Sequence, residues 1–194
     1  MKKLTAFSLT ILFSVNFSMS QVPNLMWANS QGGTSYDSGK SIAVDNSGNT
    51  YTAGIFAGTA DFDPSSNTMN ITSEGSYDGF VSKTDVNGQL VWAFSIGSSS
   101  ADEINSITID GNGDIIVVGK FQDIVDFDPS GNIFQQGAIG SADIFVAKYT
   151  SSGNFVWVKQ MGGNSEDVAF DVETDSQDNV YTTGHFYSTA DFDP

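Results

Sequence analysis

Residues 41–64, SIAVDNSGNTYTAGIFAGTADFDP, decide the fold of this chain. Ile42 and Val44 alternate with smaller residues, which is the period of a strand and places both side chains on one face. Asn-Ser-Gly-Asn at 46–49 follows, and Asn and Gly supply the positive φ angles of a hairpin turn. The run from Thr50 to Phe56 is rich in β-branched and aromatic residues. The stretch predicts a β-hairpin followed by the tetrapeptide Asp-Phe-Asp-Pro.

The same features recur every 65 residues without insertion or deletion. Such a fixed period is the mark of a repeat architecture. The positions in register are Trp27, Trp92 and Trp157; Gly32, Gly97 and Gly162; Asp37, Asp102 and Asp167; Asp45, Asp110 and Asp175; Gly54, Gly119 and Gly184; and Asp-Phe-Asp-Pro at 61–64, 126–129 and 191–194. Chance does not place so many residues in register.

Each full repeat predicts four antiparallel strands, which we name A to D. Tight turns join A to B and C to D, while a long connection carrying Asp-Phe-Asp-Pro joins B to C. The expected strands are A at 41–45, 106–110 and 171–175; B at 50–56 and 115–118; C at 79–83 and 144–148; and D at 90–94 and 155–159. No segment shows helical periodicity.

The predicted fold class is all-β, a partial β-propeller of four-stranded blades. A β-solenoid is the alternative, but its coils are shorter and parallel, whereas the turn chemistry here indicates hairpins. With a lone D strand before the first repeat and a third B strand that contains His185, the chain supplies eleven expected strands, or about 2.75 blades, and propellers close with roughly 4 to 8. We therefore expect an open arc. A fragment of a longer protein is the favoured explanation, and assembly of several copies into a ring is the other.

The repeat also divides the chain. The expected parts are a signal peptide at 1–20, a lone D strand within 21–33, a first full repeat at 34–98, a second at 99–163 and a partial third at 164–194.

Residues 1–20 have the layout of a secretory signal peptide. Lys2 and Lys3 precede an apolar stretch, and Ser18-Met19-Ser20 offers small residues at a cleavage site before Gln21. A transmembrane anchor is the alternative, but the apolar run is too short and too polar for a span of roughly 20 residues. We expect a secreted or cell-surface protein without membrane insertion.

The charge of the chain excludes nucleic-acid partners. Its formal net charge is −16, it has no arginine, and five lysines remain once the signal peptide is removed. A nucleic-acid binder needs cationic side chains to displace phosphate counterions. The chain has no cysteine either, so its stability must come from packing, sheet hydrogen bonds or bound metal.

The repeated Asp-Phe-Asp-Pro is the sharpest local signal for chemistry. In an extended strand its two carboxylates project to one side, where they could help bind Ca²⁺. The Ca²⁺ candidates are Asp61, Asp63, Asp126, Asp128, Asp191 and Asp193. The alternative, which we favour because Ca²⁺ takes 6–8 oxygens, is that the phenylalanine anchors the long connection while the aspartates cap turns.

Other candidate sites have structural interpretations that we prefer. Residues 110–114, Asp-Gly-Asn-Gly-Asp, resemble the start of a calcium loop but lack its closing glutamate and occupy a hairpin position. The three tryptophans suit core packing better than a sugar-stacking face. His185 is the single histidine, and no nucleophile motif accompanies it, so we assign no catalytic residue and expect no enzyme.

Residues 41–64 and the segment DGFVSKTDVNGQLVWAFSIG at 78–97 resemble the SBBP-type β-propeller repeat of exported bacterial surface proteins. The Gly-Asn turn, the Phe-Val-x-Lys strand and the Trp strand carry the resemblance, which covers essentially the whole chain after residue 20. It implies a propeller fold and provides no catalytic residues.

The resulting functional hypothesis is a secreted or cell-surface scaffold that binds a protein or a glycan. The alternatives are a non-catalytic part of a larger exported glycan-active enzyme and a purely structural spacer.

Overall fold

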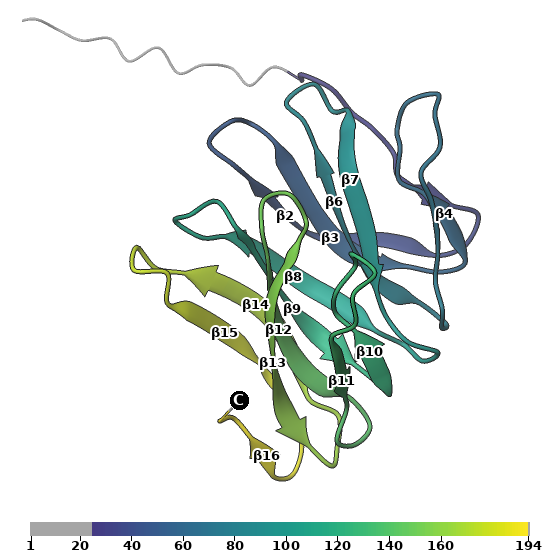
Figure 1. The fold of residues 1–194 in the computed structure, drawn as a ribbon. Helices are drawn as coiled ribbons and strands as arrows, with labels where there is room; N and C mark the ends of the chain where they lie inside the picture. Colours follow the sequence, from purple (N-terminus) through teal and green to yellow (C-terminus); the bar gives the residue numbers. More distant parts are fainter. Residues whose placement is uncertain (1–24, 194) are drawn as a thin grey trace, which may run out of the picture.

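The computed structural model describes residues 25–193, and these residues form sixteen β-strands and no helix (Figure 1). The expected signal peptide at 1–20 lies outside the described residues. Nowhere in 25–193 is there a helix of the length and apolarity that crossing a membrane requires. The predicted all-β class is confirmed: the chain folds as successive antiparallel sheets in an open arc.

The first repeat forms a four-stranded sheet in the order of the sequence, here called the first sheet. Its strands are β2 (Asp37–Val44), β3 (Thr50–Phe56), β6 (Asp78–Thr84) and β7 (Leu90–Ile96). They correspond to the predicted strands A to D. All neighbours are antiparallel, as tight A–B and C–D turns require.

The second repeat forms the second sheet with the same strand order. Its strands are β8 (Glu103–Ile109), β9 (Ile115–Phe121), β12 (Asp143–Tyr149) and β13 (Phe155–Gly163), and the short β16 (Ala190–Asp191) joins the outer end of β13. The pairing register repeats with the sequence: β3 pairs Thr50 with Thr84, and β9 pairs Ile115 with Tyr149. A bulge after Gly39 recurs after Ile104.

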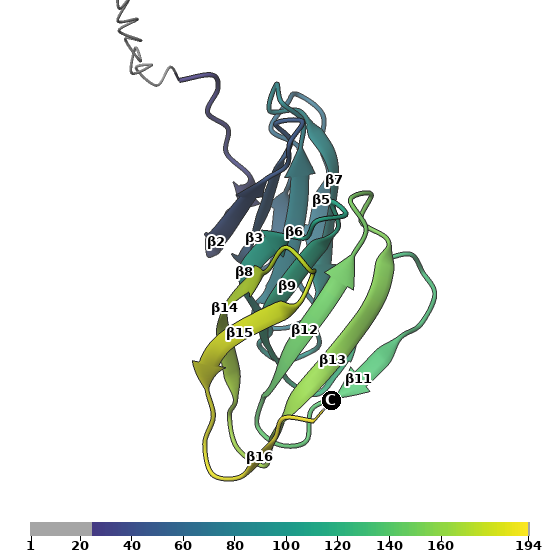
Figure 2. The ribbon, with the colours of Figure 1, turned by 90° about the vertical axis from the view of Figure 1, so that its left-hand side faces the viewer.

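The third repeat contributes only strands A and B, here called the partial sheet. They are β14 (Val168–Thr174) and β15 (Val180–His185). Figures 1 and 2 show the two strands at the yellow end of the arc, beside the second sheet. Lys120 of β9 ties these parts together, because its ammonium lies 3.3 Å from Glu103 and 2.6 Å from Glu166.

The long B–C connection contains strands that the sequence analysis did not expect. The first repeat has the hairpin β4 (Thr59–Asp61) and β5 (Asn70–Thr72), to which β1 (Gly32–Gly33) adds a third strand; the second has β10 (Ile124–Asp126) and β11 (Gln135–Gly137). These strands have only two or three residues, which is too few to show alternation.

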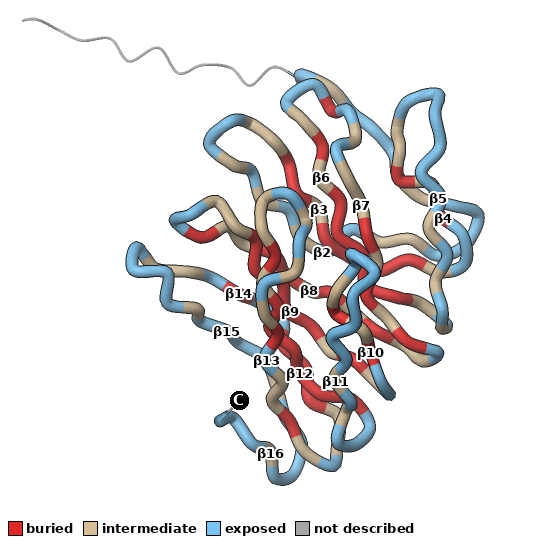
Figure 3. The backbone as a smooth tube through the Cα atoms, in the orientation of Figure 1, coloured by how far each residue is buried: buried red, intermediate tan, exposed pale blue. Residues whose placement is uncertain are grey.

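The hydrophobic core lies between the sheets. Residues of β3 and β6 pack against β8, β9 and β12, with Tyr51, Val117 and Phe145 among the fully or almost fully buried members. A second cluster, including Val118 and Val172, joins the second sheet to the partial sheet. The A strands lie nearest one another, β2 against β8 and β8 against β14. In Figure 3 the buried backbone concentrates in the middle strands, whereas β15 and β16 are mostly exposed.

The expected lone D strand is not a strand in the structure. Residues 25–31 have no regular structure, and only Gly32–Gly33 pair, with β4. A D strand needs a C strand beside it, and none of the described residues supplies one there. Trp27 nevertheless keeps the place that its repeat position gives it, as described below.

Candidate functional site

The A–B and C–D turns lie at one end of the sheets (Figure 1). Successive strands are antiparallel, so these turns share one end and the B–C connections leave from the other. We call this surface the turn face. It consists of the A–B turns 45–49, 110–114 and 175–179 and the C–D turns 85–89 and 150–154.

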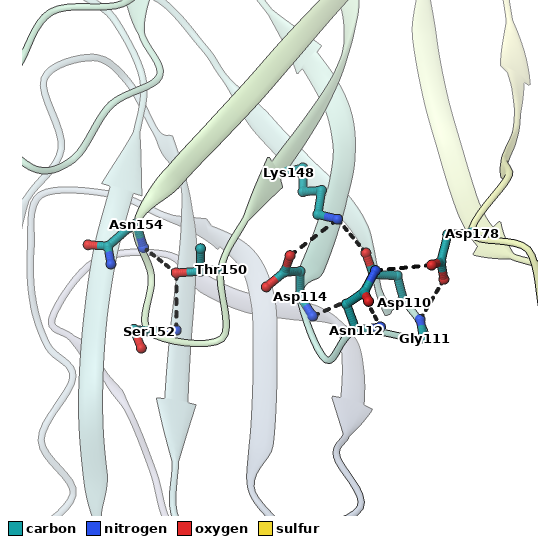
Figure 4. Close-up of polar contacts among 9 residues, drawn as sticks. All are labelled: Asp110, Gly111, Asn112, Asp114, Lys148, Thr150, Ser152, Asn154 and Asp178. Carbon is teal, nitrogen blue, oxygen red and sulfur yellow. Dashed lines mark hydrogen bonds and ion pairs between the residues drawn. The ribbon is translucent and has the colours of Figure 1, made fainter.

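One hydrogen-bonding scheme builds every turn of this face. In the second A–B turn, Asp110 Oδ1 accepts the backbone amides of Asn112 at 2.9 Å and Asp114 at 3.0 Å. In the neighbouring C–D turn, the hydroxyl of Thr150 accepts the amides of Ser152 and Asn154 in the same way (Figure 4). A side-chain oxygen that accepts amides two and four residues ahead fixes the turn.

The turns are also tied to one another across the sheets. Asp178 of the partial sheet accepts the amide of Gly111 at 2.7 Å and the side-chain amide of Asn112 at 3.0 Å (Figure 4). Lys148 of strand C lies 2.5 Å from Asp110 and 3.2 Å from Asp114. Residues 110–114 are thus a hairpin turn held by a lysine, which confirms the predicted hairpin position of this segment.

A cleft of about 590 Å³ opens on this face between the first and second sheets. Its lining residues are Val44, Asp45, Asn46, Ser47, Asn49, Lys83, Ile109, Asp110, Gly111, Asn112, Gly113 and Ser151. Lys83 is the one cation among them. Its ammonium donates to the carbonyl of Ser151 at 3.0 Å and lies 4.8 Å from the centre of the Tyr51 ring.

The two aspartates of the cleft are held in their charged form. Burial acts to raise the pKa of Asp45, but hydrogen bonds from the Asn49 side chain and from backbone amides outweigh it and lower the pKa. Burial also acts to raise the pKa of Asp110, but the hydrogen bond from Lys148 and those from backbone amides outweigh it and lower the pKa. The cleft therefore offers fixed acceptors and amides, and neither carboxyl is tuned to donate a proton.

The phenylalanines of the Asp-Phe-Asp-Pro segments anchor the B–C hairpins. Phe62 and Phe127 are buried, and Phe127 packs 5.4 Å from Phe121 and 5.2 Å from Phe145, measured between ring centroids. The hydroxyl of Tyr149 also donates to the carbonyl of Phe127 at 2.9 Å. The predicted anchoring role of the phenylalanine is confirmed.

The two aspartates of each segment do not share one strand face, contrary to the expectation. Strand β4 ends at Asp61, whose Oδ1 accepts the amides of Asp63 at 3.0 Å and Met69 at 2.8 Å, so the chain turns before the second carboxylate. Asp63 in turn accepts the amide of Ser65. Asp126, Asp128 and Asp191 repeat the first steps of this scheme. Within 25–193 no three His, Cys, Asp or Glu side chains gather as a metal site would require.

Two of the three tryptophans bind a C–D turn of the following repeat. Trp27 donates from Nε1 to the carbonyl of Val86 at 3.1 Å, and Trp92 donates to the carbonyl of Ser151 at 3.4 Å. Trp92 also stacks on Phe94 with 5.5 Å between ring centroids, and Trp157 packs against the cluster between the second sheet and the partial sheet. These contacts support the packing role rather than a sugar-stacking face.

Sequence reasoning missed a set of buried aspartates at the starts of strands A and C. Asp102 accepts the amide and hydroxyl of Ser98 and the amide of Gln122, and Asp143 accepts the amide of Ile139. They bind the loops at the end of the sheets opposite the turn face. Their spacing of 65 residues could be seen in the sequence, but their burial could not, because aspartate is normally a surface residue.

Comparison with known proteins gives one informative similarity. No protein-family model matches the sequence. An alignment 115 residues long, which covers 52% of this chain, shows 29% identity to an uncharacterized WD repeat-containing protein of Acanthamoeba polyphaga mimivirus. The match spans 8% of the length of that protein. This similarity agrees with a propeller-like repeat protein, and the SBBP type remains a prediction.

Proposed function

We propose that this chain is a non-catalytic scaffold that acts outside the cell and binds a protein or a glycan at the turn face. The cleft between the first and second sheets is the observation that carries the proposal. Its rim of amides, carboxylates and one ammonium can bond to hydroxyls or to peptide groups. Similarity to a WD repeat-containing protein supports an interaction role.

The chemistry of the cleft favours binding over reaction. Glycoside hydrolysis requires two carboxyls in unlike environments, one of them protonated at working pH. The pKa values of Asp45 and Asp110 are both lowered, so neither carboxyl holds a proton at working pH. His185 lies on β15 and is not among the residues that line the cleft.

A steric block tests the binding surface. Asn46→Trp places an indole in the cleft, whereas Ser176→Trp makes the same change at the equivalent turn position of the partial sheet, outside the cleft. Arrays of oligosaccharides and of peptides provide the probes. We expect the probe that binds the wild type to lose about tenfold in affinity with Asn46→Trp and to keep its affinity with Ser176→Trp. Binding unchanged by Asn46→Trp would remove the cleft from the proposal, and no binding at all would favour a spacer.

Export is tested separately. Expression in a bacterium with a secretion system, followed by mass spectrometry of the intact product, should give a chain that begins at Gln21. A product that keeps residues 1–20 would contradict export through a cleaved signal peptide.

A further inference from the structure

A carboxylate joins the A–B turns of the second and third repeats. Asp178, at the fourth position of the third turn, accepts the backbone amide of Gly111 at 2.7 Å and the side-chain amide of Asn112 at 3.0 Å. The backbone of Asp178 lies in the left-handed region, with φ at 62°. A short acidic side chain on one turn thus binds the second and third positions of the turn before it.

The A–B turns of the first and second repeats lack this carboxylate. Moved back by one repeat, Asp178 becomes Gly113, and its two partners become Asn46 and Ser47. Gly113 has the same left-handed backbone, with φ at 84°, and a Cβ on it would meet no atom within 4 Å. Gly113, Asn46 and Ser47 all line the cleft of about 590 Å³. The cleft therefore includes the place that the side chain of Asp178 has one repeat later.

The first turn offers donors to a carboxylate at this place. The backbone amide of Asn46, which corresponds to that of Gly111, donates to no described residue, and neither does the hydroxyl of Ser47. Gly111 and Asn112 each bind a different oxygen of Asp178, so these two turn positions can hold both oxygens of one carboxylate.

Lys83 adds a positive charge to the cleft. Its equivalent in the second sheet, Lys148, is bound by two aspartates of the second A–B turn. In the first A–B turn the side-chain amide of Asn49 binds Asp45 instead, at 2.7 Å. Among residues 25–193 no carboxylate lies within ion-pair distance of Lys83, whose ammonium donates to the carbonyl of Ser151. The cleft thus contains a cation that no described acid pairs with.

The two aspartates that line the cleft are compatible with a further carboxylate. Asp45 Oδ1 accepts the backbone amides of Ser47 and Asn49, and its Oδ2 accepts the side-chain amide of Asn49. Asp110 corresponds to Asp45, and Asp178 binds the residue directly after Asp110. A carboxylate is therefore accepted beside a turn of this kind.

We propose that the cleft binds an aspartate side chain of a partner peptide, in the place that Asp178 has between the second and third turns. Asn46 and Ser47 donate to the carboxylate, and Lys83 supplies the opposite charge. A peptide is favoured over an acidic sugar because the group at the equivalent place is itself an aspartate on a turn. The inference rests on the proposed function, since it names the partner of the same cleft.

The first experiment changes the partner. An array of loop peptides, each closed by a disulfide and each matched by a copy with asparagine in place of aspartate, provides the probes. Fluorescence anisotropy with the full chain measures their affinities. We expect the peptides that bind to contain aspartate and to lose about tenfold or more in affinity when asparagine replaces it, because a charge-assisted contact is lost. Lys83→Met in the chain should reduce the difference between the two peptides.

The second experiment lets the chain supply the carboxylate itself. We expect Gly113→Asp to bond to Asn46 as Asp178 does to Gly111, and so to weaken the aspartate peptides about tenfold or more. The matched control is Gly113→Ala, which places a side chain on the same left-handed backbone without a carboxylate and should keep the affinity of the wild type. Circular dichroism of both variants checks that they are folded.

The outcomes separate this inference from the proposed function. Peptides that Asn46→Trp blocks but that bind equally well with asparagine would overturn the aspartate site and leave the cleft as a binding surface. Unchanged binding by Gly113→Asp would overturn it too. Binding of glucuronic acid oligosaccharides without any peptide would assign the carboxylate to a glycan. Absence of binding by every probe would overturn both the inference and the proposed function.

Discussion

The second sheet and the partial sheet contain the same aromatic residues at the same repeat positions, but only the second sheet buries them. Phe127 is 0% exposed, and Phe192, one repeat later, is 49% exposed. The local structure around the two phenylalanines is alike. Asp126 accepts the backbone amide of Asp128, and Asp191 accepts that of Asp193. Burial in this fold therefore comes from strand C and not from the local motif.

The largest expected effect comes from truncating these two phenylalanines. Phe127→Ala removes a fully buried ring and leaves a void among Phe121, Phe145 and Tyr149, which should cost about 3–5 kcal/mol of unfolding free energy. Phe192→Ala should cost less than about 1 kcal/mol, because half of the ring is already in water. Urea denaturation of the two variants measures both; equal losses would mean that the partial sheet is covered in solution.

The sequence predicted what the repeat period and the turn residues determine. The A–B and C–D hairpins, the sheet order and the anchoring of Phe62 follow from alternation, from Asn and Gly in the turns and from one apolar residue between two aspartates. It did not predict the hairpin β4–β5, which is too short to show a pattern. It also placed a lone D strand within residues 21–33, because the similarity between repeats does not tell whether a neighbouring strand is present.

The candidate site was predicted less well than the fold. The aspartates of the turns were recognised as turn residues, yet the cleft that they line depends on how two sheets pack. Lys83 reaches Ser151, which is 68 residues away, and no local pattern indicates that contact.

The second-largest effect concerns a carboxyl that only complete sheets possess, Asp78 at the start of strand C. Burial raises its pKa to about 6, although the amides of Glu74 and Gly75 partly oppose the shift. Below the ordinary pKa of 3.8 both folded and unfolded states hold the proton. As the pH rises from about 4 to about 6 the unfolded state loses its proton first, so stability falls over this window.

The expected loss for Asp78 is about 3 kcal/mol, the equivalent of its pKa shift. Urea denaturation between pH 4 and pH 7 measures it. The asparagine side chain of Asp78→Asn cannot ionise, so the stability of this variant should fall less over the same pH range. The remaining fall comes from Asp102, because burial raises its pKa as well. A wild-type stability that climbs through this window would contradict the assignment.

A smaller effect is expected from the turns, because a lysine holds the aspartate of the second A–B turn and not that of the third. Lys148→Met leaves the almost fully buried carboxylate of Asp110 without its ammonium partner, which should cost about 2 kcal/mol. Asp175, the equivalent carboxylate, has its pKa lowered to about 2 by the Asn179 side chain and by backbone amides of its own turn. Asp175→Asn keeps an acceptor oxygen for the amides of Gln177 and Asn179 and leaves no buried charge without a partner, so it should change the melting temperature less than Lys148→Met does.

Replacing the tryptophans tests whether each repeat is held by the turn of the next. Trp92→Phe loses the hydrogen bond to Ser151 and part of the packing on the neighbouring turn, an expected cost of about 1 kcal/mol. Trp157→Phe should cost less, because among the described residues no C–D turn lies against its indole. Thermal melts of the two variants, with the wild type alongside, measure the difference, and a larger loss for Trp157→Phe would reverse the interpretation.

The smallest expected effect is that of calcium. Asp61 and Asp126 each commit one carboxylate oxygen to two backbone amides, so the pairs Asp61–Asp63 and Asp126–Asp128 offer fewer free oxygens than Ca²⁺ takes. Asp191 holds one amide among the described residues, so the partial sheet is where a cation would find the most open carboxylate. The melting temperature should be the same in millimolar Ca²⁺ and in chelator. A rise with Ca²⁺ that Asp191→Asn abolishes and Asp126→Asn does not would show that the open end of the arc, unlike the complete sheets, binds metal.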